Sequence, residues 1–424
     1  MSARLTVLLF LSLCIASPLQ ARDRGQVPEA YGRTFIRADA VQTLQIPPLQ
    51  SAPEGAAFLQ RVQQQEWLGG PYGAGLSQSL LDAANYFQGR GDSAQAVALL
   101  KRSIHLTRIN NGLYSTLQLP LLKSLLKNHI NFGDLEAASE IQSWIFHLQQ
   151  ENYQQDDAAY IQAAIEYATW QRKLWILNPD PEDPDRLYRV WQLLDQLVPP
   201  EEAEPLSVTD LQSLVYARLK LLYLVSVANF GLDAETEMML GRSYARQQAQ
   251  PNVARSQMQH LKKAAFSRGV ALLESLLERL DNSPDYLARA EAQRQLGDWQ
   301  LWFSHKSRAI THYTEAWRAL DADASGQLRQ AWFGQPTELP AGEVLYAGAA
   351  PQADLQQATR LTASFSVSAR GRPREIEILL TDEEEQSGRY RLIRLLKKTR
   401  FRPRMEAGEL VKTAHVQREY ELLL

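Results

Sequence analysis

The chain has 424 residues, of which 45% are hydrophobic and 22% charged, and its formal net charge is −3. These values are ordinary for a soluble globular protein, and the length exceeds the size at which one hydrophobic core keeps growing. The single cysteine is Cys14. If the N-terminal segment that contains it is removed, the remaining chain has no cysteine, which excludes thiol catalysis and thiolate metal sites.

The first 21 residues have the three-part pattern of a secretory signal. Arg4 supplies a positive charge, residues 5–16 are apolar, and Ala21 ends the segment with a small residue. Pro18 interrupts the apolar run before it reaches the length of about 20 residues that a membrane-spanning helix needs. We therefore expect residues 1–21 to be cleaved and the protein to be periplasmic, with association to the outer membrane left open.

Residues 22–56 are rich in Pro, Gln and Ala and show no sustained period, so we predict an extended lead-in. From residue 57 to residue 321 apolar residues recur at helical spacing, interrupted by Gly, Asn and Pro. The predicted fold class is therefore mainly α, with an array of helical hairpins.

Two segments of this region share an internal pattern. Each has an apolar helix, a Gly-Asp turn at Gly91-Asp92 or at Gly133-Asp134, and then a second helix that carries Ala96 or Ala138. The step between the two alanines is 42 residues, and a repeat at such a period indicates a solenoid of stacked hairpins.

A third segment, LGDWQLWFSHKSRAITHYTEAWRAL, carries a closely related pattern. It contains Gly297, Ala309, Tyr313 and Ala316, and it resembles the tetratricopeptide repeat (TPR), in which small residues let two antiparallel helices approach closely. The resemblance implies that Gly297 faces the backbone of the partner helix, Ala309 the seam of the hairpin, and Tyr313 the next hairpin. With Ala96 and Ala138, these residues are the predicted structural seam of the repeats.

Glycines and prolines mark a linker over residues 322–354, and residues 355–424 then show the alternation of strands. The order is strand (LTASFSVSA), turn (RGRP), strand (EIEILL), helix (SGRYRLIRLLKKTRF) and a last strand over 410–422. With RFRPRMEAGEL after the helix, this order resembles the C-terminal domain of the TonB family. The predicted fold class therefore adds a small α+β domain of TonB-like kind to the array.

The last strand is the predicted site of partner binding. A sheet this small keeps at least one edge with unpaired backbone groups, where an extended segment can add as a further strand. The candidate residues alternate between two faces, and the alternative is that the linker covers this edge. They are Val416, Gln417, Arg418, Glu419 and Tyr420.

The search for chemistry predicts no catalytic residue, no metal site and no cofactor. His305 and His312 share a helix face but lack a third ligand, and Glu383 to Glu385 read as a solvated loop. Nucleic acid is not an expected ligand of the basic run RYRLIRLLKKTRFRPR, which is interpreted mainly as a solvated helix face. The alternative for this run is attraction to anionic lipid or to an acidic partner, and contact with a membrane surface is left open and not predicted. The nine tryptophans are expected mostly in the seams between helices, with a few able to serve as binding anchors.

Taken together, these patterns favour a non-enzymatic scaffold for protein–protein interaction in the envelope of a Gram-negative bacterium. The array and the TonB-like domain would be its two binding surfaces, and an outer-membrane receptor or complex is a possible class of partner. The alternative is a TonB-type energy-transducing component or accessory. Against that alternative, the sequence predicts neither a retained membrane helix nor a long Pro-rich spacer.

Overall fold

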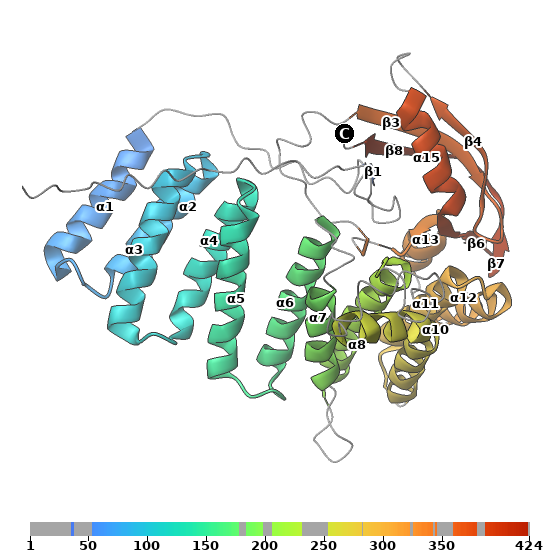
Figure 1. Cartoon of the computed structure of the whole chain (residues 1–424), viewed down its shortest axis with the longest axis horizontal. Helices are drawn as coiled ribbons and strands as arrows, with labels where there is room; N and C mark the ends of the chain where they lie inside the picture. The colour runs from blue at the N-terminus through green and yellow to red at the C-terminus, as the bar shows by residue number, and fades with distance from the viewer. Residues whose placement is uncertain are drawn as a thin grey trace, which may run out of the picture.

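The computed structural model describes residues 35–37, 53–177, 184–197, 206–230, 253–281, 283–322, 325–341, 344–345, 359–379 and 386–422. Within them, a long array of helices is followed by a small domain of strands with the helices α13 and α15, at the C-terminal end of the array (Figure 1). Residues 1–21 and the acidic loop 382–385 lie outside the described residues. No described helix combines the length and apolar character needed to cross a membrane.

Antiparallel helices make up the array. They are α1 (Pro53–Gly69), α2 (Leu76–Gly89), α3 (Ser93–Asn111), the 3-10 turn η4 (Thr116–Gln118), α4 (Leu119–Asn131), α5 (Leu135–Asn152), α6 (Ala158–Leu177), α7 (Asp185–Gln196), α8 (Val208–Val227), α10 (Val253–Leu280), α11 (Tyr286–Trp302), α12 (Lys306–Ala319) and the 3-10 turn η6 (Leu320–Ala322). The prediction of a mainly helical array is confirmed. The first helix begins at Pro53, four residues before the predicted boundary, and proline suits the first turn of a helix.

The Gly-Asp turns explain how two of the hairpins close. Gly91 and Gly133 have φ angles of 81° and 75°, which only glycine adopts without strain. The aspartate that follows each glycine then caps the next helix. A carboxylate oxygen of Asp92 accepts a hydrogen bond from the backbone N–H of Gln95, and one of Asp134 accepts from the backbone N–H of Ala137. One dipeptide therefore ends the first helix of a hairpin and starts the second.

The array has more than one hydrophobic core. One core joins α1 to α5, and a second, larger one runs from α5 to α11. The last hairpin, α11 and α12, shares a separate core with residues from beyond the array, among them Phe333, Leu339 and Met405. The C-terminal residues thus cover the apolar end of the array.

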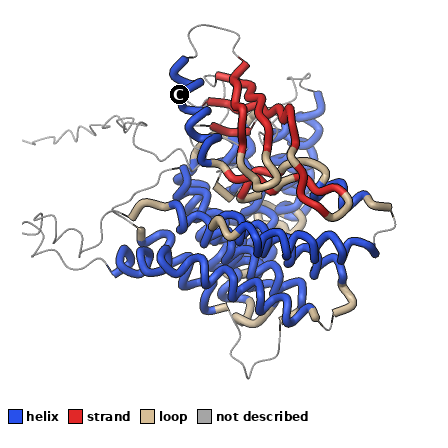
Figure 2. Tube along the Cα trace, turned by 90° about the vertical axis from the view of Figure 1, so that its right-hand side faces the viewer, coloured by secondary structure: helices blue, strands red, loops and turns tan. Residues whose placement is uncertain are grey.

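The C-terminal domain is built around a four-stranded antiparallel sheet with the order β1-β8-β3-β4 (Figure 2). Its elements are β1 (Phe35–Arg37), α13 (Gln327–Phe333), β2 (Thr337–Leu339), β3 (Thr359–Val367), β4 (Pro373–Leu379), α15 (Gln386–Lys398), β5 (Arg400–Arg402), β6 (Arg404–Glu406), β7 (Glu409–Val411) and β8 (Thr413–Leu422). Helix α15 buries Leu392, Leu395 and Leu396 against the sheet in a core with Phe365 and Phe401. The predicted small α+β domain is therefore present.

Two segments that the sequence analysis left without structure form elements. The lead-in contains β1, which pairs antiparallel with the end of β8, and the linker contains α13 and β2, which pairs with β5. These strands have three residues each, so the alternation that reveals a strand cannot develop in them. Their pairing comes from tertiary contact with distant segments.

The predicted seam residues are all inside the array. Ala96, Ala138, Ala309 and Ala316 are at most 1% exposed, and Tyr313 is fully buried. A Cβ added at Gly297 would lie 2.5 Å from Cε1 of Tyr313, so glycine makes room for this ring. Gly297 therefore faces a side chain of its partner helix rather than the backbone. The ring of Tyr313 fills its own hairpin, whereas the sequence analysis expected it to face the next one.

The array and the C-terminal domain meet at a buried carboxylate. Asp298 of α11 is 1% exposed, and its Oδ2 lies 2.7 Å from Nη1 of Arg402 on β5 and 3.7 Å from Nη1 of Arg294. The Tyr313 hydroxyl donates to Oδ1 of Asp298 over 2.9 Å. Burial and the negative charge of Asp298 hold the pKa of Tyr313 well above its ordinary value, so the hydroxyl stays a donor.

Replacing Gly297 by alanine should lower the free energy of unfolding by about 1 to 3 kcal/mol, because the added methyl group overlaps the Tyr313 ring. Gly89→Ala is the matched control, since Gly89 also lies in a helix and an added Cβ there meets nothing within 4 Å. Urea denaturation followed by circular dichroism measures both. Equal stability of the two variants would contradict the assigned seam.

Asp298→Ala should cost about 3 to 5 kcal/mol, because it leaves the buried guanidinium of Arg402 without its counter-ion and removes one of the two carboxylates beside Arg294. Glu406→Ala removes the partner of Arg404 in an exposed pair and should cost at most about 1 kcal/mol. In the Asp298→Ala background, Arg402→Met should be less harmful than in the parent chain. Additive effects in this double-mutant cycle would show that the two groups do not act as a pair.

Candidate partner-binding surfaces

Each of the hairpins α2–α3 and α4–α5 makes the same hydrogen bond from its end to the loop that precedes it. Asn110, near the end of α3, donates to the Tyr72 carbonyl over 3.0 Å, and Asn152, at the end of α5, donates to the Tyr114 carbonyl over 2.8 Å. Both asparagines and both tyrosines are related by the same 42-residue step as Ala96 and Ala138. The repeat therefore fixes how successive hairpins stack, as well as how each one closes.

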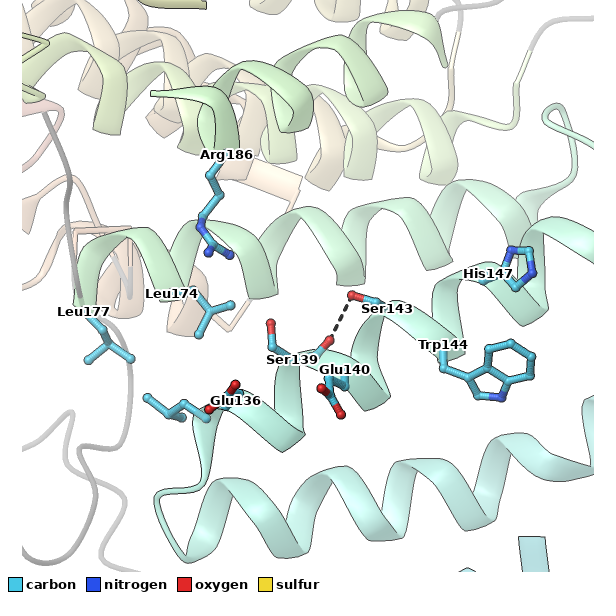
Figure 3. A pocket seen from close by; sticks show the side chains of 10 residues that line it. Glu136, Ser139, Glu140, Ser143, Trp144, His147, Leu174, Leu177 and Arg186 are labelled. Carbon is cyan, nitrogen blue, oxygen red and sulfur yellow. Dashed lines mark hydrogen bonds between the residues drawn. The ribbon is translucent and has the colours of Figure 1, made fainter. Parts of the chain in front are cut away.

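A groove runs along α5, facing the ends of α6 and α7 (Figure 3). Its volume is ≈ 770 Å³, and Leu135, Trp144, Leu174 and Leu177 supply its apolar surface. Arg186 points from the start of α7 toward α5, and its guanidinium donates to Oε1 of Gln171 over 2.5 Å. The groove is thus open, largely apolar, and framed by three helices.

A second recess of ≈ 380 Å³ lies on the other side of α5, against α3 and α4. Ile104, Leu122 and Ile141 form part of its lining, and it shares Glu140 and Trp144 with the first recess. Because the two recesses meet at these residues, they make one surface across the first hairpins. We call this surface the Trp144 groove.

Trp144 is held by contacts on several sides. The Arg108 guanidinium lies 5.1 Å from the centre of the indole ring, the Tyr114 ring stacks with it at 6.2 Å, and His147 lies at 5.5 Å. Its Nε1 is buried and has no hydrogen-bond partner. A half-buried tryptophan whose ring is held in place by its neighbours is suited to anchor a partner through its exposed apolar surface.

The charges around the Trp144 groove are unevenly distributed. Lys101, His105 and Arg108 line the recess toward α3, and burial lowers the pKa of Arg108. Glu136 and Arg186 line the recess toward α6, and Glu140 lines both recesses. A segment lying across both recesses would therefore meet mainly cationic groups at one end and the two glutamates toward the other.

The predicted edge of the C-terminal sheet is only partly an edge. Strand β8 lies between β1 and β3, and Tyr420 is paired with Arg37 of β1, so the expectation of a free edge is wrong there. From Thr413 to Arg418, no described strand pairs with the outer side of β8. The expectation failed because the lead-in returns to the sheet.

The side chains of β8 alternate as the sequence indicated. Val416 and Tyr420 are buried and Gln417 and Glu419 are exposed, while Arg418 is half-buried and donates to the Pro336 carbonyl over 3.2 Å. The Tyr420 hydroxyl donates to Oε2 of Glu338 over 3.3 Å. The segment around β2 thus contacts the inner face of β8, which leaves its exposed face and its outer edge upstream of Tyr420 as the candidate surface.

The histidines of the last hairpins have ordinary surroundings. His305 stacks on Phe266 at 4.4 Å, and Nδ1 of His312 lies 2.9 Å from Oε1 of Gln293. Among the described residues, no three His, Cys, Asp or Glu side chains are placed to hold a metal ion together.

Sequence reasoning did not single out the Trp144 groove. Trp144 was one of nine tryptophans, and its helix carries the weaker of the first two repeat copies. The available signal was a difference between the copies: the 42-residue step aligns Trp144 with Arg102 and Glu140 with Ala98, whereas His147 aligns with His105. Where the two copies have different residue types although their packing residues are the same, the position is typical of a surface and not of the seam.

No family model and no curated protein matches the chain. Among solved structures, it is similar to TPR-like repeats, nearly identical to one another, from a Podosopora anserina protein named for the kinesin light chain. Identity is 13%, the TM-score 0.35, and coverage 58% of this chain and 96% of that one. A single-residue variant of that protein matches with a TM-score of 0.36.

Proposed function

We propose that the protein is a non-enzymatic scaffold that binds other proteins in the periplasm of a Gram-negative bacterium. The observation that carries the proposal is the Trp144 groove, an open apolar surface with a positioned tryptophan and unevenly distributed charges. Stacked hairpins present such extended surfaces to partners. The location rests on the signal pattern of residues 1–21 alone.

The chemistry of the Trp144 groove favours one kind of ligand. Its apolar lining suits the apolar face of a partner helix, which packs by side chains at every third or fourth position. The partner helix would carry acidic residues where it meets Lys101 and Arg108, and basic residues where it meets Glu136 and Glu140. The proposed ligand is therefore an amphipathic helical segment with its charges divided between its ends.

The C-terminal domain offers the second proposed surface. From Thr413 to Arg418, β8 has no described strand on its outer side, so an extended segment of a partner can add there through main-chain hydrogen bonds. The resemblance of this domain to the TonB family supports such strand addition and makes an outer-membrane receptor a candidate partner.

Substitutions in the Trp144 groove should weaken partner capture at least tenfold without unfolding the chain. Glu140→Lys reverses an exposed charge shared by both recesses, and Trp144→Ala removes the anchor. Tyr390→Ala, at a 64% exposed position on α15, is the matched control. Capture from envelope extracts is quantified by mass spectrometry, and circular dichroism checks the fold. Partners retained equally by all three variants would exclude the groove as the binding site.

A proline in the outer edge of β8 should reduce capture of any partner that adds as a strand. Gln417→Pro and Arg418→Pro are made separately, because only one of the two amides points outward, and proline there removes a donor without emptying the core. The variant whose proline replaces the outward amide should lose capture and keep its circular dichroism spectrum. Unchanged capture by both folded variants would rule out strand addition here.

A further inference from the structure

Exposed apolar side chains are concentrated in two turns at one edge of the array. Half of the fourteen large apolar side chains that are exposed among the described residues lie in the connections from α1 to α2 and from α3 to α4, counted here with the last residues of α1 and α3. We call this set the apolar rim. Its members are Trp67, Leu68, Tyr72, Ile109, Leu113, Tyr114 and Leu117.

The two turns lie side by side. The side chain of Asn110 in the second turn donates to the Tyr72 carbonyl in the first, over 3.0 Å. Helices α1 and α3 run in the same direction, and both turns lie at the lower edge of the array in Figure 1. The apolar rim is therefore one continuous surface and not two separate loops.

Charged residues are absent from both turns. None occurs from residue 67 to residue 81 or from residue 109 to residue 122, over a chain in which 22% of residues are charged. Transfer of a charge out of water is costly, whereas apolar side chains gain from it. The apolar rim can thus enter a medium of low dielectric constant without burying an ion.

Several backbone groups of the turns also have hydrogen-bond partners inside the array. The carbonyls of Tyr72 and Tyr114 accept hydrogen bonds from Asn110 and Asn152, and the Gly73 and Gly112 amides donate to carbonyls of their own turns. Unsatisfied backbone groups make loops costly to bury in an apolar medium. These bonds remove part of that cost for the apolar rim.

The side chains of the apolar rim project outward. Their exposed fractions run from 43% for Tyr114 to 84% for Trp67. A protein partner would have to supply a matching recess for each projecting side chain, whereas a fluid bilayer conforms to all of them. Tryptophan and tyrosine also favour the boundary between lipid headgroups and acyl chains.

A cationic group lies behind the apolar rim. Lys101 is exposed about 12 Å from Ile109 along α3 at the usual rise per residue, and Arg102 beside it pairs with Glu66. The Arg108 guanidinium is held inside the array by Gln118 and Trp144. The depth of Lys101 suits contact with headgroups when the turns are inserted, and lysine at this level favours anionic phospholipids.

We propose that the apolar rim attaches the protein to the surface of an anionic phospholipid bilayer, with the two turns inserted at the interface. The Trp144 groove extends along α5 toward Leu135 and Leu177, away from the two turns, so this part of it stays open to a protein partner while the turns are inserted. The rim thus adds a lipid surface to the proposed scaffold function and does not depend on it.

Vesicle flotation tests the proposal with the chain from Arg22 onward, so that the apolar leader does not contribute. The vesicles contain phosphatidylethanolamine and phosphatidylglycerol. The parent chain should float with them, and the variant Trp67→Ser, Leu113→Ser, Leu117→Ser should bind at least tenfold more weakly. The control replaces three other exposed apolar residues, all outside the apolar rim, by serine, and it should bind like the parent. These are Phe132, Ile310 and Leu379, which are 46% to 49% exposed.

A second measurement reports insertion directly. Vesicles with brominated acyl chains should quench part of the tryptophan fluorescence of the parent chain, and Trp67→Phe should remove most of that quenching. Absence of flotation by the parent chain, or equal flotation of the rim and control variants, would overturn the proposal. So would a concentration-dependent dimer, seen by sedimentation velocity and lost in the rim variant, in a protein that does not float.

Discussion

The ion pair between Asp298 and Arg402 is the contact on which the joining of the two parts of the molecule depends. It is made between residues 104 positions apart, and both side chains are almost fully buried, so neither charge can be left alone without a large cost. Tyr313 can donate to Asp298 only because Gly297 leaves room for its ring. The packing of the last hairpin and the docking of the C-terminal domain are therefore one arrangement.

The same arrangement covers the last hairpin of the array. A terminal hairpin has an apolar face with no further repeat to cover it, and solenoids normally need a polar capping element. Here Phe333, Leu339 and Met405 cover the last hairpin, and at α6 the buried Arg172 donates to the Val344 carbonyl. The segment after the array thus acts as a cap, which explains why a stretch that reads as a linker holds α13 and β2.

The sequence predicted the parts of the fold that depend on local chemistry. The pattern that recurs after 42 residues combines a glycine with positive φ, a capping aspartate after it, and an alanine at the helix seam. It could not predict β1, β2 or the ion pair of Asp298, because each exists only through a partner far along the chain. The Trp144 groove was missed for a related reason: its residues come from helices whose spacing only stacking determines.

The same 42-residue repeat that builds the core also shapes the proposed surfaces. Buried positions such as Ala96 and Ala138 are kept from copy to copy, and so are the asparagines that tie one hairpin to the next. Positions that point outward are released from packing, so Arg102 in one copy can be Trp144 in the next. The sides of the hairpins then carry a groove while their ends carry an apolar rim. None of the seven side chains of the apolar rim lines the groove, but the two surfaces meet where Tyr114 stacks on Trp144 and at Lys101, which lies beside both.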